Sequence, residues 1–198
     1  MAEFRQINLN PFKIKTGDCV VRSLVGGTLL GYKTISDLLG VRLEPGMGVI
    51  DGVMFKEIEG FSEKTGIILP LDLEITPEMN ITASDMTYFS RYGGFPLKFW
   101  VDNLQVPPGE NRVIFESKLQ PTDLIPGGRS TNFHVVFANL ARKEYYDTWD
   151  SGNTVVFGAY YVDPSKVAKK DSPDYYKTEA DSMRRENMEY LKSRFRKS

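Results

Sequence analysis

The stretch GDCVVRSLV, residues 17–25, places the chain's one cysteine where a turn gives way to an apolar helix. Apolar residues recur from there to Leu30 at the spacing of one helical face, interrupted by the pair Gly26 and Gly27. We therefore expect a first helix that is weakened in its middle. Unpaired backbone N–H groups at a helix start favour negative charge, so this position favours the reactive thiolate form of Cys19.

The chain's one histidine lies in a second informative stretch, NFHVVFANL, residues 132–140, which predicts a strand. After a short turn, the segment KEYYDTWD, residues 143–150, predicts the returning strand of a hairpin. Counting back from the turn, Asp147 falls near His134, where its carboxylate can hold the imidazole in one tautomer. Asp150 is the alternative carboxylate, but it lies nearer the following turn.

Three further helices are expected before the chain becomes strand-like. Each has an apolar face or a capping signal at its start, and each is followed by glycine. They cover residues 34–39, 55–65 and 82–92, and the glycines that end them are Gly40, Gly66 and Gly93. Between the second and third of these helices, the segment IILPLDLEI contains Pro70 and predicts an edge strand.

Five strand-like runs follow, separated by turn sequences such as PPGE and SGN. They cover residues 96–104, 111–119, 132–140, 143–150 and 154–162. Helices first and strands later predict an α+β domain over residues 1–164, with N-terminal helices packed against a C-terminal antiparallel β-sheet. We expect the chemistry to lie between these two halves.

Residues 165–198 form a charge-rich C-terminal extension with ten Lys or Arg against six Asp or Glu. The extension is therefore positive, whereas the rest of the chain is negative. Its sparse apolar residues have partly helical spacing, which predicts a terminal helix that docks on the domain, on another copy or on a partner. A helix that is simply solvated is the alternative.

Composition argues against several classes of protein. A formal net charge of -1 gives no support for a nucleic-acid or anionic-membrane partner. No stretch approaches the ~18 apolar residues of a membrane-spanning helix, and residues 1–10 lack the apolar core of a signal peptide, so we expect a soluble protein made in a cytoplasm. One cysteine excludes an internal disulfide and a multi-cysteine zinc site. Asp147 and Asp150 lack the further acidic spacing of a cation site, so we expect no metal and no cofactor.

The order cysteine, histidine, aspartate, with the cysteine on the first helix, resembles the papain-like cysteine peptidases. More narrowly, the motifs DCVVRSL, GYKTISDLLG, HVV and YYDTWDSG are similar to small papain-like proteins encoded by bacteriophages, over roughly residues 10–162. The resemblance implies a papain-like fold and a peptidase, isopeptidase or amidase that acts on a protein or peptide substrate. It implies Cys19 as nucleophile, His134 as general base and acid, and Asp147 as the residue that orients the histidine.

The sequence departs from the family at the oxyanion position. Papain-like enzymes place a glutamine or asparagine shortly before the nucleophile, and Lys13 stands there in this chain. The alternatives are Gln6, Asn8, Asn10 and Thr16, none of which matches the family pattern. This gap, with the charged extension, favours a second hypothesis. In it the protein is a catalytically silent papain-like virion component or host-protein binder that uses residues 165–198.

Two further residues near these motifs have more than one interpretation. Trp149 follows the proposed orienting residue, so we expect it to line a substrate cleft, although most strand aromatics are core. Arg22 lies one helical turn after the cysteine. It can pair with Asp18 or Asp37 in a helix-surface salt bridge, or anchor a substrate carboxylate.

Overall fold

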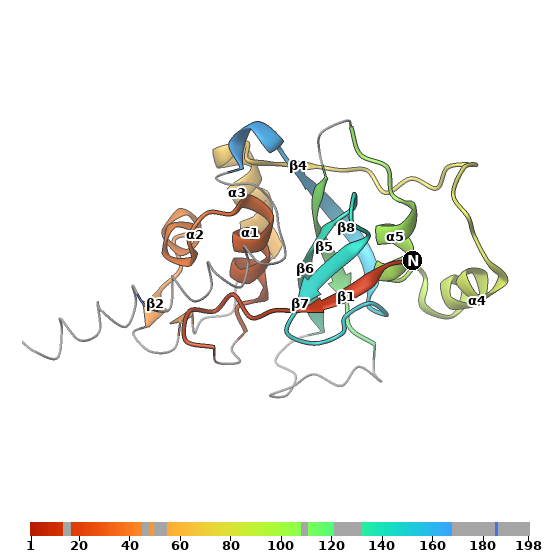
Figure 1. Cartoon of the computed structure of the whole chain (residues 1–198), viewed down its shortest axis with the longest axis horizontal. Coiled ribbons are helices and arrows are strands. Elements are labelled where there is room, and N and C mark those ends of the chain that lie inside the picture. Colours follow the sequence, from red (N-terminus) through yellow and green to blue (C-terminus); the bar gives the residue numbers. More distant parts are fainter. Residues whose placement is uncertain are drawn as a thin grey trace, which may run out of the picture.

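The computed structural model describes residues 1–13, 17–44, 48–49, 55–107, 111–120, 132–167 and 185. In this part of the chain, an α+β fold places five helices around a six-stranded mixed sheet (Figure 1). The helices are α1 (Cys19–Thr28), α2 (Tyr32–Leu39), α3 (Phe55–Thr65), α4 (Ala83–Tyr92) and α5 (Leu97–Asn103). The strands are β1 (Glu3–Gln6), β2 (Leu43–Glu44), β3 (Gly48–Val49), β4 (Ile68–Pro70), β5 (Arg112–Lys118), β6 (Phe133–Asn139), β7 (Glu144–Asp147) and β8 (Val155–Val162).

The sheet has the strand order β1-β7-β6-β5-β8-β4, and the short strands β2 and β3 form a separate pair. Strands β5 to β8 and β4 pair antiparallel, and β4 lies at one edge as the sequence predicts. The expectation of a purely antiparallel sheet is wrong at the other edge, because β1 runs parallel to β7. The segment EFRQ has no apolar alternation, so nothing in its own sequence announces this strand.

The expectation of a strand over residues 96–104 is also wrong, because this segment forms α5. Four of its buried residues, Leu97, Trp100, Val101 and Leu104, recur at intervals of three and four, which is the helical period, and Phe99 is buried beside them. Pro96 occupies the N-cap position, where the missing N–H costs no helical hydrogen bond. A short apolar run with aromatics fits both periods, and packing against the sheet selects the helix.

Apolar residues cover both faces of the central strands. Ile114 of β5 and Phe137 of β6 contribute to one buried cluster, while Val113 and Phe115 contribute to a second. Helices α1 and α3 cover the first face, α2 packs against α1 on the side away from the sheet, and α5 covers the second face (Figure 1). Strands buried on both faces explain why these runs are almost continuously apolar rather than alternating.

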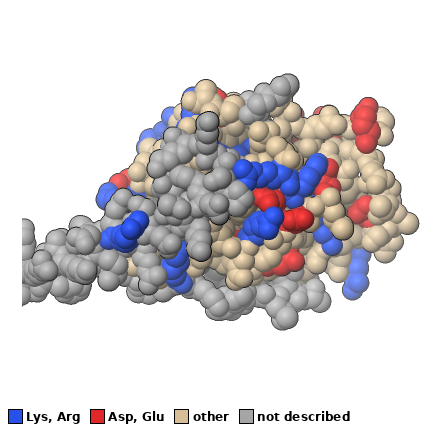
Figure 2. All heavy atoms as spheres, in the orientation of Figure 1, with Lys and Arg blue, Asp and Glu red and all other residues tan. Residues whose placement is uncertain are grey.

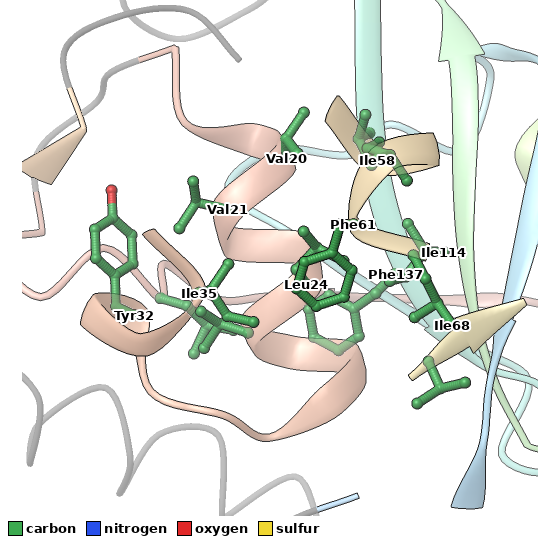
Figure 3. Close-up of a cluster of buried hydrophobic side chains, with 14 of the residues drawn as sticks. Val20, Val21, Leu24, Tyr32, Ile35, Ile58, Phe61, Ile68, Ile114 and Phe137 are labelled. Atoms are coloured by element: carbon green, nitrogen blue, oxygen red, sulfur yellow. The ribbon is translucent and has the colours of Figure 1, made fainter. Parts of the chain in front are cut away.

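Helix α1 lies directly on the sheet, and Figure 3 shows its Leu24 among side chains from α3 and the central strands. The helix is continuous from Cys19 to Thr28, so Gly26 and Gly27 do not interrupt it, and it ends two residues before Leu30. A β-carbon built on Gly26 would lie 2.1 Å from Phe137 Cε1. The glycine therefore lets α1 approach β6 closely.

The glycines predicted to end the following helices do so. Gly40, Gly66 and Gly93 have φ of 69°, 58° and 77°, in the left-handed region that glycine adopts without steric cost. Thr82 caps α4 with a capping box to Asp85, which matches the expected start of that helix.

Charged side chains of both signs are interspersed on the face seen in Figure 2. Arg5 on β1, for example, pairs with both Glu3 and Glu144. Within the described ranges, no helix has the length and apolar character needed to cross a membrane. The predicted extension over residues 165–198 lies outside the described residues, apart from positions 165–167 and Arg185.

Candidate active site

Cys19 is the first residue of α1; the residue is partly buried, and its thiol is not in a disulfide. The preceding residue, Asp18, occupies the N-cap position without a side-chain cap hydrogen bond. The first intrahelical bond runs from Arg22 N to Asp18 O at 3.0 Å, so the N–H groups before Arg22 have no partner within the helix. The cysteine therefore stands at the positive end of the helix dipole.

Strand pairing explains why the start of α1 meets β6. Strand β7 pairs only with residues 137–139 of β6, which leaves the backbone of Val135 to other partners. Ser23 donates its hydroxyl to Val135 O at 2.9 Å, and the neighbouring backbone of Val135 lowers the pKa of the Cys19 thiol. These two contacts hold the first turn of α1 beside His134, the residue that precedes Val135.

His134 and Asp147 form a buried pair at the ends of β6 and β7. The distance from His134 Nε2 to Asp147 Oδ2 is 2.5 Å, and the two side chains are 8% and 2% exposed. Because Nε2 faces the carboxylate, Nδ1 is the ring nitrogen left to interact with Cys19, whose pKa His134 lowers. The structure thus brings together the three residues Cys19, His134 and Asp147.

Asp150, the alternative carboxylate, lies apart from the histidine. Its Oδ1 accepts the Tyr145 hydroxyl at 2.6 Å and the Gly152 N–H at 3.0 Å, so it closes the turn after β7. Trp149 packs its ring against the imidazole of His134, with the centroids 5.1 Å apart. Since Trp149 is buried, it contacts the histidine rather than presenting a free aromatic face.

Electrostatics favour a charged cysteine and histidine. Burial raises the pKa of Cys19, but hydrogen bonding and charge from His134, together with the charge of Arg22, bring this pKa below its ordinary value. Burial lowers the pKa of His134, but Asp147 and Cys19 outweigh it and raise this pKa to about 10. The opposite directions of the two shifts describe a thiolate beside an imidazolium.

Asp147 is held as a carboxylate by several partners. Burial raises its pKa, but the charge and hydrogen bond of His134 and the charge of Arg22 lower it further than burial raises it. Its second oxygen, Oδ1, accepts the Thr148 N–H at 2.7 Å and faces Arg22 Nη1 at 3.4 Å. The carboxylate therefore stays deprotonated while it orients the imidazole.

A second buried carboxylate, Asp18, lies on the other side of Arg22. Asp18 accepts hydrogen bonds from Arg22 Nε at 2.8 Å, from the Tyr32 hydroxyl at 2.7 Å and from Asn10 Nδ2 at 2.9 Å. Of the two pairings predicted for Arg22, that with Asp18 is confirmed, while Asp37 pairs with Lys33 on the surface of α2. The Arg22 side chain is only 11% exposed, so the expected surface bridge lies largely in the interior instead.

The side chains considered for the oxyanion position have partners elsewhere. Asn10 Nδ2 bonds to Asp18, Lys13 Nζ donates to Asn8 O at 3.0 Å, and Gln6 Nε2 faces Thr148 O at 3.4 Å. Thr16 lies outside the described residues. Among the positions the structure does describe, no group of three or more His, Cys, Asp or Glu side chains is arranged to hold a metal ion.

Sequence reasoning missed the supporting residues Ser23 and Tyr32. Their partners, Val135 and Asp18, are distant in sequence or on another helix, so no local pattern marks them. Comparison with family models, with curated proteins and with solved structures gives no match for this chain. The interpretation of the site therefore depends on its geometry and on the sequence motifs.

Proposed function

We propose that the protein is a papain-like cysteine hydrolase, a peptidase, isopeptidase or amidase, with Cys19 as nucleophile. The observation that carries this proposal is the contact of Cys19 at the start of α1 with His134, which Asp147 orients from a 2.5 Å hydrogen bond. A nucleophile, a base within reach and a third group that fixes the base are the requirements for thiol catalysis.

The reaction begins when the Cys19 thiolate attacks the carbonyl carbon of an amide and forms a tetrahedral oxyanion. The unpaired N–H groups at the start of α1 are the donors that stabilise this charge. The His134 imidazolium then gives its proton to the leaving nitrogen, the C–N bond breaks, and an acyl thioester remains on Cys19.

Water completes the cycle. Neutral His134 takes a proton from the water, the hydroxyl attacks the thioester, and the carboxylic acid leaves as the thiolate and the imidazolium re-form. Throughout, Asp147 keeps Nε2 protonated, so that Nδ1 is the nitrogen that exchanges protons with the substrate and with water. Packing of Trp149 on the ring restricts its rotation.

Alkylation with iodoacetamide tests the activated thiol. With one cysteine in the chain, every adduct reports on Cys19. We expect alkylation at pH 6 to be at least ~10-fold faster than that of a model thiol, because the thiolate is populated below the usual range. His134→Ala should lose this advantage while remaining folded. A rate equal to that of the model thiol in the wild-type protein would sink the proposal.

A second candidate function is a papain-like scaffold without turnover, serving as a virion component or a host-protein binder. It is favoured by one observation, that the amide of Asn10 and the ammonium of Lys13 are bonded to protein groups. Incubation with a proteome-derived peptide library separates the two functions. New peptide termini that disappear with Cys19→Ala support the hydrolase, whereas unchanged peptides alongside a reactive Cys19 support the scaffold.

The scaffold hypothesis also assigns a role to residues 165–198. Truncation after Pro164, with measurement of oligomeric state by light scattering, tests whether this extension mediates assembly. An unchanged oligomeric state would remove the assembly role from the extension.

A further inference from the structure

We propose that Arg22 is a positioning residue that sets the charge balance of the site, and that Asp18 is the carboxylate that holds Arg22 in place. This inference rests on the proposed cysteine hydrolase. It extends the site beyond the triad to Asp18, the residue before the nucleophile, and Arg22, the residue one helical turn after it.

The guanidinium of Arg22 lies between two buried carboxylates. Its Nε is 2.8 Å from Asp18 Oδ1, and its Nη1 is 3.4 Å from Asp147 Oδ1. The Arg22 side chain is 11% exposed, and those of Asp18 and Asp147 are 1% and 2% exposed. A planar fork with several donors can bridge two carboxylates in this way, whereas the single ammonium of lysine cannot reach both in the same geometry.

Asp18 is fixed independently of Arg22. Tyr32 from α2 and Asn10 from the N-terminal segment both donate to Asp18 Oδ2, which leaves Oδ1 for Arg22. Asp18 and Arg22 flank Cys19 on the first turn of α1, and Asp18 holds the guanidinium whose Nη1 faces Asp147. The contact of Arg22 with Asp147 therefore connects the helix that carries the nucleophile to the strand that carries Asp147. A displaced guanidinium would loosen this connection.

Charged groups of both signs surround Cys19 and His134. Asp18 and Asp147 are negative, Arg22 is positive, and Cys19 with His134 sums to zero whether the proton is on sulfur or on nitrogen. Tyr32 and Asn10 contribute neutral donors, and Lys13 donates to the Asn8 carbonyl. Asp18, Asp147, Arg22 and the Cys19–His134 pair therefore sum to one negative charge, and removal of Arg22 would make it two; Lys13 adds a positive charge that is the same in every variant.

A more negative cluster holds protons more strongly. Without Arg22, Cys19 should lose its proton at higher pH, and His134 should keep its proton to higher pH. Asp18→Asn removes one negative charge but keeps a side-chain oxygen that can accept from Arg22 Nε, so Arg22 stays in place and both titrations should move to lower pH. The charge of Arg22 acts in the expected direction, since it lowers the pKa of both Cys19 and Asp147.

The test is the pH dependence of iodoacetamide alkylation of Cys19 in the full chain. We expect the midpoint to rise by about one pH unit in Arg22→Met and to fall by up to about one unit in Asp18→Asn. Arg22→Lys keeps the charge, so its midpoint should stay near wild type while its plateau rate falls, because the bridge to both carboxylates is lost.

Opposite shifts in the two variants cannot come from general damage to the fold, which would move both midpoints toward that of a free thiol. Shifts in the same direction, or no shift in either, overturn the role of Arg22. If Arg22→Met does not fold, Asp18→Asn decides alone, and a midpoint that is unchanged or raised overturns the inference. A wild-type midpoint equal to that of a free thiol would instead reject the proposed function itself.

Discussion

Replacing Gly26 with alanine should destabilise the fold, because the added methyl group has no room between α1 and β6. The β-carbon would lie 2.1 Å from Phe137 Cε1, whereas carbon atoms in contact are normally ~3.5 to 4.0 Å apart. Relief of the clash therefore requires a movement of roughly 1.5 Å by the helix or by the ring. The ring is confined, since Phe137 is buried and stacks on Tyr146 with centroids 4.9 Å apart.

Two effects of opposite sign determine how much Gly26→Ala changes the free energy of unfolding. Alanine is better than glycine in a helix interior by about 1 kcal/mol. Overpacking a buried position costs about 1 to 3 kcal/mol, and the roughly 1.5 Å movement needed here places Gly26→Ala at the upper end of this range. The net expectation is a loss of roughly 2 kcal/mol in the free energy of unfolding.

Gly27→Ala is the matched control. A β-carbon at Gly27 meets Ile114 at 3.2 Å and Val162 at 3.3 Å, so small shifts of flexible side chains accommodate it. Its stability should stay within about 1 kcal/mol of wild type. Urea unfolding of both variants measures the difference, and equal stabilities would refute the close approach of α1 to β6. Because Ser23 and Cys19 lie on the same helix, Gly26→Ala should also slow alkylation of Cys19.

Further predictions concern the titrating groups. Asp147→Asn should slow alkylation of Cys19 at pH 7 by at least ~10-fold, because His134 loses the carboxylate that stabilises its charged form. Asp150→Asn should leave the rate near wild type. Equal effects of the two variants would contradict the role of Asp147 as the residue that orients His134. A third prediction compares the free energy of unfolding of Cys19→Ser with that of Cys19→Ser/His134→Gln. The stabilisation by His134 should be complete below pH ~6.5, and it should be lost as the pH rises through the raised pKa of the histidine. Urea unfolding across this range measures it, and a contribution that grows with pH would refute the pairing with Asp147.

Local signals in the sequence predict where several of the helices end. Gly40, Gly66 and Gly93 mark helix ends because glycine adopts positive φ at no steric cost, a property that does not depend on the rest of the fold. The pairing of His134 with Asp147 was also predictable, since a hairpin of known turn position fixes which residues meet.

Other features depend on contacts that no local pattern contains. Strand β1 pairs with β7, which lies far along the chain, and its own residues are mostly exposed. Residues 96–104 fit a strand and a helix equally well until the sheet is present to bury Trp100. The bridge of Arg22 to Asp147 likewise requires α1 to be docked, so the sequence predicted only the partners within reach along the chain, Asp18 or Asp37.

We infer that Cys19 and His134 form a charged pair at neutral pH. The chain has a single histidine, so the charge of this residue can be measured directly. Titration of the imidazole nitrogen resonances by NMR, in tag-free protein and in Cys19→Ala, reports its charge. We predict an imidazolium that persists well above pH 7, with a pKa that falls when Cys19 is removed. A histidine that titrates near its ordinary pKa of ~6.5 and does not respond to the loss of Cys19 would contradict it.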